Sequence, residues 1–466
     1  MNATQRPLHD DVNRRTFLQM VGALGGGALF LTACGGSSST PGKVKLEFWT
    51  PGGSAPFCGA FDDAGKAFTL AHPDITFAPV TCGTGKQDFN EALLARIAAG
   101  NPPDVVILWG SPVALGARHA LQALDSYMPG SQHCQTSKWP SGALASCQFK
   151  GSTYGFPLLA GTYVMWYNQD WFDQKGISSK REDFPKTWDE LRRLSKEFTH
   201  WNGDKLETAG FIPNLPDPAV GLAVWSALNG SQIYDAANQK YTIDSPENIA
   251  LAQFFVDWLN EEYRGNINLV KNAGSWNSYP DDQNRPPAFQ KGRLAMLFNG
   301  SWVMGDMYAT SEPTFKRWNL APLPVGPMGK GTVTGTWPNW VAIPAGSKNP
   351  ADAFKYIDYL SVDGMVKVYN VAPDLLANKD APSTLVPKIV IEKRGQEFAQ
   401  EAASFFRQQQ DLITPMWNSP IQDFSDDQLK SAWEKIMAKT ATPTQALQSA
   451  QQTCQQQLET FLKQQS

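Results

Sequence analysis

The stretch Asn101-Pro102-Pro103-Asp104-Val105-Val106-Ile107-Leu108-Trp109 decides the fold. Its two prolines end a preceding helix, because proline lacks the amide hydrogen and restricts the residue before it. The apolar run that follows is continuous rather than alternating, which is typical of a strand buried on both faces of a parallel sheet. We therefore predict a parallel sheet with helices covering both of its faces.

The residues before this strand alternate between strand and helix signals. Residues 44–49 predict a first strand, 57–71 a helix and 75–80 a second strand. Residues 88–99 predict a second helix because their apolar side chains have the spacing of one helix face. The order β-α-β-α-β predicts an α/β protein. The side chains of that helix face are Phe89, Leu93, Leu94 and Ile97.

Helix start signals continue further along the chain. The segment Thr187-Trp188-Asp189-Glu190 is a capping box, and Ser245-Pro246 and Asn349-Pro350 place proline at the first helical position. The Gln-rich segment 445–466 keeps Leu458 and Leu462 on one face, so we expect a surface helix there.

The N-terminal residues have the layout of an export signal. Arg14-Arg15 precedes the uncharged stretch 20–33, which is shorter than the roughly 20 apolar residues that span a bilayer. The arginine pair indicates twin-arginine export. Leu31-Thr32-Ala33-Cys34 resembles a bacterial lipobox. We predict a signal over 1–33, then a lipidated Cys34 and flexible tether over 34–43 that hold the protein on the extracytoplasmic face of the cell membrane.

Composition and charge exclude several functions. The formal net charge is −4, the pI is near 5.8, and no basic run occurs, so we expect no nucleic-acid partner. No Cys-x-x-Cys occurs and the five histidines lack metal-ligand spacing, so we expect no metal and no cofactor. We also expect a monomer.

Five cysteines remain after Cys34 in an oxidising compartment. Four of them allow three connectivities. We favour Cys58–Cys82 and Cys134–Cys147, because each pair is close in sequence, and the first would join the start of a helix to the end of the next strand. Cys454 would be left as a free thiol in a helix.

Several segments together resemble one protein family, the carbohydrate-type extracellular solute-binding proteins of ABC importers to which maltose-binding protein belongs. They occur in the family's order across about residues 44–370. The matching segments are Asn101 to Val106, Tyr154-Gly155-Phe156-Pro157, Trp166-Tyr167-Asn168, Pro185 to Leu191, Phe289 to Met296, Asn299-Gly300-Ser301-Trp302, Gly335-Thr336-Trp337, Val341 to Pro344 and Lys348-Asn349-Pro350.

The resemblance implies a type II periplasmic binding protein, with two α/β lobes joined by hinge crossovers and a cleft between them. We expect crossovers near 158–162, 320–322 and 369–373. Lobe 1 then comprises 44–159 plus 321–370, and lobe 2 comprises 160–320 plus 371–466. The implied role is non-enzymatic: a lipoprotein that captures a mono- or oligosaccharide in the cleft and delivers it to the permease by closure.

A sugar site needs flat aromatic surfaces for the C–H faces of the ring and fixed polar groups for its hydroxyls. The resemblance places Trp302 on a family sugar-stacking position. It also aligns Gly161 with a sugar-binding Glu at the first crossover of maltose-binding protein, which departs from the maltodextrin pattern. The remaining candidates are chosen because they lie in loops, at the ends of strands or at positions that match the family. These are Trp49, Trp109, Trp225, Trp337, Trp340 and Trp417, with Asp217, Asn339 and Asn299 as polar partners.

Three alternatives stay open. An exported glycosidase would need two carboxylates about 5–10 Å apart, whereas the acids here occur as adjacent pairs such as Asp62-Asp63 and Glu261-Glu262. The same fold could instead bind a polyamine. It could also bind a glycerophosphodiester, whose phosphate Arg118 or Arg285 could hold. A surface adhesin without a transport role is also consistent with the sequence.

Overall fold

The computed structural model describes residues 43–52, 55–83, 86–213, 215, 218–272, 287–308 and 312–465. The predicted export signal, Cys34 and nearly all of the tether lie outside the described residues, as do Asp217 and Arg285. Within the described part, no helix has the length and apolar character needed to cross a membrane.

A five-stranded sheet forms the centre of lobe 1, in the order β4-β2-β5-β16-β8. The predicted strand at the decisive stretch is confirmed as β5, which is buried at all four residues and pairs in parallel with β2. The sheet is mixed rather than parallel, because β16 runs antiparallel to β5 and β8. The strands are β2 (Phe48–Thr50), β4 (Thr81–Cys82), β5 (Val105–Leu108), β8 (Phe156–Pro157) and β16 (Trp340–Ala342).

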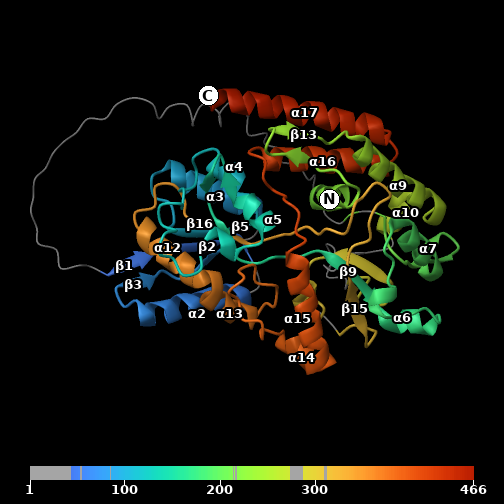
Figure 1. Cartoon of the computed structure of the whole chain (residues 1–466), viewed down its shortest axis with the longest axis horizontal. Coiled ribbons are helices and arrows are strands. Elements are labelled where there is room, and N and C mark those ends of the chain that lie inside the picture. The colour runs from blue at the N-terminus through green and yellow to red at the C-terminus, as the bar shows by residue number, and fades with distance from the viewer. Residues whose placement is uncertain are drawn as a thin grey trace, which may run out of the picture. The chain divides into compact units, whose positions relative to one another are not determined.

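The first predicted strand is split in two. β1 (Val44–Leu46) pairs with β3 (Ile75–Phe77) outside the main sheet, and β2 enters the sheet two residues later. The two predicted helices are confirmed as α2 (Ala55–Ala71) and α3 (Lys86–Ala98). Figure 1 shows α2 beside α13, which it contacts. The other elements of this lobe are α4 (Pro112–Gly116), α5 (Ser141–Leu144), the hairpin β6 (Gln148–Phe149) and β7 (Ser152–Thr153), α12 (Pro350–Tyr359) and α13 (Met365–Tyr369).

Lobe 2 is built around a second sheet, in which β9 (Val164–Asn168) lies between β14 (Met296–Asn299) and β15 (Trp318–Ala321) and runs antiparallel to both. All residues of β9 are buried. Two hairpins accompany this sheet: β10 (His200–Asn202) with β11 (Lys205–Thr208), and β12 (Tyr234–Asp235) with β13 (Lys240–Tyr241).

The helices of lobe 2 begin where the sequence signals predict. Thr187 forms the capping box of α7 and Ser245 caps α9. Side chains of the Gln-rich helix fix it against the β12–β13 hairpin. Gln451 and Gln455 form hydrogen bonds with the backbone of Tyr241 and Ile243, where a further strand would otherwise pair. The helices are α6 (Gln169–Gln174), α7 (Trp188–Phe198), α8 (Pro218–Leu228), α9 (Pro246–Glu262), α10 (Ile267–Asn272), α11 (Val303–Asp306), α14 (Lys388–Arg394), α15 (Gln396–Gln410), α16 (Gln422–Met437) and α17 (Pro443–Gln464).

Three chain crossovers lie side by side where the lobes join. Residues 158–163 pair on one side with 334–339, through Leu158 N to Asn339 O at 2.8 Å and Trp337 N to Gly161 O at 3.1 Å. On the other side they pair with 375–377, through Ala160 N to Leu375 O at 2.6 Å. The chain therefore forms two α/β lobes joined by three crossovers.

Two predicted lobe boundaries are corrected by these contacts. Residues 322–333 stay with lobe 2, because Val325 pairs with Thr187 and Gly326 N donates to Leu228 O. The second crossover therefore lies at 334–339 rather than 320–322. The third extends beyond 373, because Asp380 forms ion pairs with His133 and Lys138 of lobe 1.

The cysteine prediction is half right. Cys58 and Cys82 form the predicted disulfide between α2 and β4, and Cys454 is free in α17, as predicted. The Cys134–Cys147 pairing is wrong, since both are buried free thiols. Each sulfur lies beside a serine hydroxyl instead, Cys134 Sγ at 3.4 Å from Ser361 Oγ and Cys147 Sγ at 3.8 Å from Ser146 Oγ.

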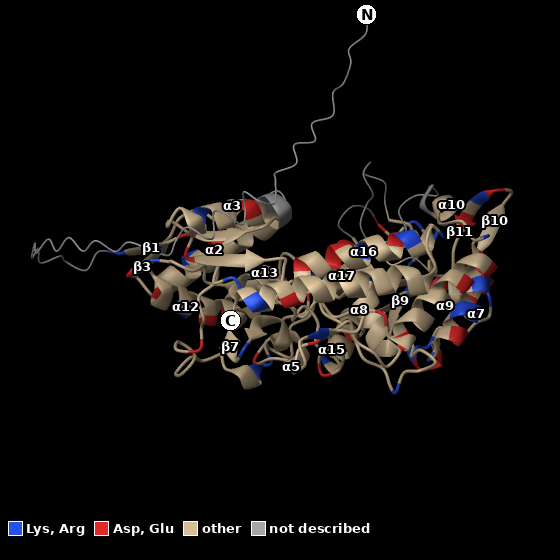
Figure 2. Ribbon diagram, turned by 90° about the horizontal axis from the view of Figure 1, so that it is seen from above, with Lys and Arg blue, Asp and Glu red and all other residues tan. Residues whose placement is uncertain are grey.

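Charges are distributed over the surface rather than segregated. Figure 2 shows acidic and basic residues interspersed on α7 and α16. Typical pairs are Lys196–Glu261 and Arg192–Asp189, both accessible to solvent and therefore worth little to stability.

Candidate functional site

Trp302 lies where β14 gives way to α11. Its half-buried indole meets the ring of Tyr163 edge to face, with centroids 5.3 Å apart and an interplanar angle of 88°. Tyr163 in turn stacks on Phe298 at 5.0 Å. The Trp302 Nε1–H is buried without an acceptor among the described residues. The structure thus holds this ring in place while leaving its donor unused.

Trp337 is held in a similar way on the second crossover. Its half-buried ring meets that of Trp417 edge to face, with centroids 5.0 Å apart. Trp417 is buried and donates its Nε1–H to Thr336 O at 3.1 Å. Its φ of +61° is uncommon for a bulky side chain. Trp417 is therefore a fixed support behind Trp337.

Gly161 connects the two aromatic pairs. Its φ is +50°, and a Cβ there would lie 2.1 Å from the Trp337 carbonyl oxygen. The next residue, Thr162, donates its N–H to Ser301 Oγ at 3.2 Å, beside Trp302. The close approach of the second crossover explains why glycine stands where the family resemblance aligns a glutamate. Gly161 therefore lets the two crossovers approach each other, and it has no side chain with which to bind a ligand.

Three further candidates lie at separate places in the structure. Trp109 is half-buried after β5, and its ring lies against Gly52. Trp49 lies inside β2 and donates its Nε1–H to Glu47 Oε1 at 2.7 Å. The Asn339 carbonyl accepts a backbone bond at the second crossover, and its side chain is half-buried. Trp109 and Asn339 remain candidates, whereas Trp49 already has its partner.

Two predicted ligand contacts are core residues. Trp225 is fully buried and packs against four aromatic rings, because it faces inward from α8. Trp340 is fully buried in β16, where its ring meets that of Trp417 and its Nε1–H donates to Ser146 Oγ at 2.6 Å. We therefore remove both from the candidate site. The rings around Trp225 are those of Trp188, Phe211, Phe255 and Phe298.

Sequence reasoning missed a buried acid beside this site. Asp374, on the third crossover, accepts hydrogen bonds from Ser301 Oγ and, at 2.7 Å, from Leu375 N. Burial raises the pKa of Asp374 to about 7. The signal in the sequence was a lone acid among apolar residues at a predicted crossover.

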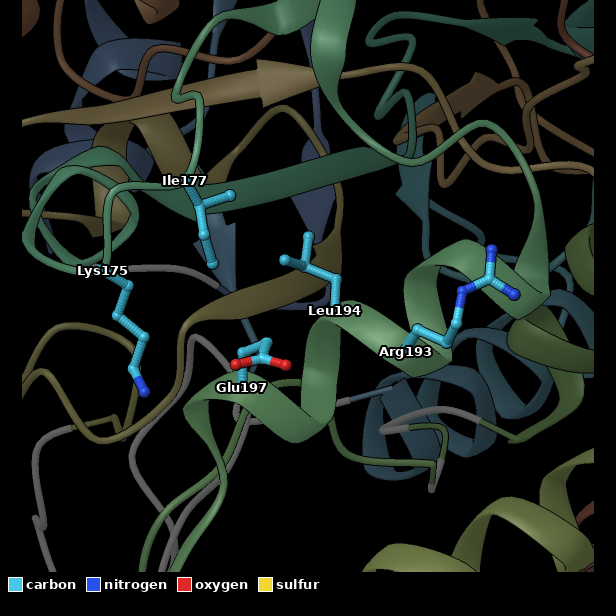
Figure 3. Close-up of a pocket in the computed structure, with 5 residues that line it drawn as sticks. All are labelled: Lys175, Ile177, Arg193, Leu194 and Glu197. Carbon is cyan, nitrogen blue, oxygen red and sulfur yellow. The ribbon is translucent and has the colours of Figure 1, made fainter.

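The surface pocket in Figure 3 lies elsewhere on lobe 2. It is lined by Lys175, Ile177, Arg193, Leu194 and Glu197, and none of the candidate tryptophans contributes to it. Among the described residues no group of three His, Cys, Asp or Glu side chains is placed to hold a metal ion. The aromatic pairs at the crossovers are therefore the strongest candidate site.

Two α/β lobes, three crossovers and aromatic pairs at those crossovers define a type II periplasmic binding protein. The chain belongs to the family of bacterial extracellular solute-binding proteins, which matches residues 59–367. This assignment agrees with the architecture, since the matched region contains the three-stranded sheet, all strands of the five-stranded sheet except β2, and two of the three crossovers.

Two relatives and one solved structure show what the chain is similar to. The arabinooligosaccharide-binding protein of Halalkalibacterium halodurans is 24% identical over 61% of this chain and 59% of its own. The maltooligosaccharide ABC transporter solute-binding lipoprotein of Streptococcus pneumoniae is 25% identical over 50% of this chain and 51% of its own. The chain thus spans less than two thirds of these relatives. The structure of CpMnBP1 with mannotriose bound is 24% identical, with a TM-score of 0.68 over 88% of this chain and 99% of its own.

Proposed function

We propose that this protein captures a carbohydrate between its lobes and delivers it to the permease of an ABC importer. One observation carries the proposal: two half-buried indoles, Trp302 and Trp337, stand at the crossovers, each backed by a buried aromatic ring. A pyranose presents apolar C–H faces that such rings can stack on. The names of the similar proteins support a sugar as the ligand.

Polar groups beside the rings suit the hydroxyls of a sugar. The Nε1–H of Trp302, whose ring is half-buried, has no acceptor among the described residues. A buried polar group left unpaired costs about 1–3 kcal/mol, so a ligand oxygen that reaches this donor recovers that energy. Half-buried Asn339 is a further candidate for the rim.

The proposed mechanism is binding linked to closure. The crossovers are short and pair with each other, so rotation about them moves one lobe relative to the other as a body. A ligand that contacts both lobes favours the closed form by its differential affinity for that form. The permease then recognises the closed arrangement, and no covalent step is involved.

We further propose that Cys34 carries the lipid anchor that holds the mature protein on the extracytoplasmic face, after twin-arginine export. The lipobox-like sequence and the lipoprotein name of the Streptococcus pneumoniae relative support this. Wild-type protein should partition into the detergent phase of Triton X-114, whereas Cys34→Ser should remain aqueous. Equal partitioning of both would contradict the proposal.

A thermal-shift screen tests the binding function. Mannotriose, maltotriose and arabinotriose are compared with spermidine and glycerophosphocholine. A hundredfold excess over Kd stabilises the folded state by about 2.7 kcal/mol. We expect a shift with at least one saccharide and no release of reducing sugar. A shift with spermidine or glycerophosphocholine alone, or hydrolysis of an oligosaccharide, would overturn the proposal.

A further inference from the structure

The loop that carries Trp302 is held from both sides by the third crossover. Before the tryptophan, Ser301 donates its hydroxyl to Asp374. After it, Gly305 of α11 packs on Pro373, where an added Cβ would lie 3.2 Å from the proline Cδ. Residues 301 and 305 therefore rest on two consecutive residues of a crossover.

Ser301 also contacts the first crossover. Its Oγ accepts the Thr162 N–H at 3.2 Å while donating to Asp374. Both Ser301 and Thr162 have no exposed surface, and Asp374 has only 6%. A single serine hydroxyl thus joins two of the three crossovers, at the residue before the indole.

We propose that Asp374 is a positioning residue of the carbohydrate site, which acts through Ser301 to set the orientation of Trp302 according to the position of the third crossover. The inference rests on the proposed function in taking a sugar as the ligand. It extends that function by coupling the hinge to the stacking ring: a movement of residues 373–374 carries Trp302 with it.

The charge of Asp374 provides a readout of this coupling. The pKa of Asp374 is raised to about 7 in total: burial is the main cause and the negative charge of Asp306 on α11 adds to it, whereas the bonds from Ser301 and Leu375 act in the opposite direction. Burial raises the pKa of Tyr369 on α13. The negative charge of Asp374 raises that pKa further, and the positive charge of Arg407 on α15 lowers it. Ionisation of Asp374 strengthens the bond from Ser301, because a charged acceptor forms the stronger hydrogen bond.

The first experiment needs no ligand. The protein is labelled with 5-fluorotryptophan, and the fluorine resonance of Trp302 is assigned with Trp302→Phe. Between pH 5 and pH 9 this resonance should titrate in the wild type, with a midpoint near 7 that Asp306→Asn lowers. Asp374→Asn should abolish the response, and Ser301→Ala should reduce its amplitude. Ser361→Ala is the matched control, because it removes another fully buried serine hydroxyl, whose bonds to Ile357 O and Cys134 Sγ do not involve Asp374, Thr162 or Trp302.

The second experiment is calorimetry with mannotriose and maltotriose. Ser301→Ala should weaken binding by about tenfold, as the loss of one hydrogen bond at the site would, while Ser361→Ala leaves it unchanged. The affinity of Asp374→Asn should be independent of pH, unlike that of the wild type. If neither sugar binds the wild type, the proposed ligand class fails and the fluorine experiment still decides the coupling. A Trp302 resonance that titrates equally in Ser301→Ala and the wild type overturns the inference.

Discussion

The indole of Trp302 stands perpendicular to the ring of Tyr163, edge against face at 5.3 Å. This geometry leaves a broad ring half-exposed while an aromatic partner restrains its rotation. Trp302→Ala should therefore remove binding rather than stability. The loss of an anchoring tryptophan costs about 2 kcal/mol or more, so affinity for the stabilising saccharide should fall at least about thirtyfold. Calorimetry and the melting temperature of the free protein check this, and a large loss of unliganded stability would assign Trp302 to the core.

Trp225 and Trp337 should show opposite behaviour. Trp225 is fully buried among aromatic rings, so Trp225→Ala should lower the free energy of unfolding by about 3–5 kcal/mol. Trp337→Ala exposes its support Trp417 but removes a half-buried ring, so it should mainly weaken binding. Urea unfolding and calorimetry on both variants separate these effects, and equal destabilisation by the two would contradict the assignment.

Gly161→Ala should destabilise the junction of the lobes. The new Cβ would need space occupied by the Trp337 carbonyl, at a φ of +50°. Gly151 is the matched control, since its φ is +81° and nothing lies within 4 Å of an added Cβ. Gly151→Ala bears the backbone strain alone, about 1–2 kcal/mol, and Gly161→Ala should lose clearly more in urea unfolding. Similar losses would show that the close approach has no energetic consequence.

The disulfide Cys58–Cys82 closes a loop of 24 residues. The disulfide restricts the unfolded chain, so its loss should lower the free energy of unfolding by about 3 kcal/mol. The double variant Cys58→Ser/Cys82→Ser should melt lower than the wild type without reductant and should not respond to dithiothreitol. Alkylation of the denatured, unreduced wild type should label Cys134, Cys147 and Cys454. Labelling of Cys58 under these conditions would contradict the assignment.

Glu262 should make stability depend on pH. It is buried among hydroxyl and indole donors, including Ser195 Oγ and Trp258 Nε1, each at 2.7 Å, and has no ion-pair partner among the described residues. Burial raises its pKa from the ordinary value of a glutamate. Because the folded pKa exceeds the unfolded one, its contribution to stability is fully present at low pH and is lost as pH rises through the folded pKa.

Glu262→Gln keeps an acceptor for Trp258 and removes the titration, so it should be more stable than the wild type at pH 8 and closer to it at pH 4.5. Glu262→Ala should be less stable at both pH values, by about 1–3 kcal/mol for each donor left unpaired. Chemical unfolding at the two pH values measures these differences. A wild type and Glu262→Gln with parallel pH profiles would contradict the predicted ionisation.

Local sequence determined the elements that depend on local chemistry. The prolines before β5, the capping box at Thr187 and the Pro246 start of α9 were readable because each acts within one helical turn. The continuous apolar run of β5 fixed its burial, and the ordered family segments indicated two lobes. The Cys58–Cys82 bridge was also within reach, since its cysteines belong to consecutive elements.

Only the tertiary structure decided which aromatic and polar groups meet. Trp225 and Trp337 are alike in sequence terms, yet one faces the core from a helix and the other stands half-buried on a crossover. Ser301 and Asp374 are 73 residues apart, and Gly161 is explained only by the Trp337 carbonyl beside it. The physical reason is range: capping and periodicity act over a few residues, whereas burial and the partners of a polar atom are set when distant segments pack together.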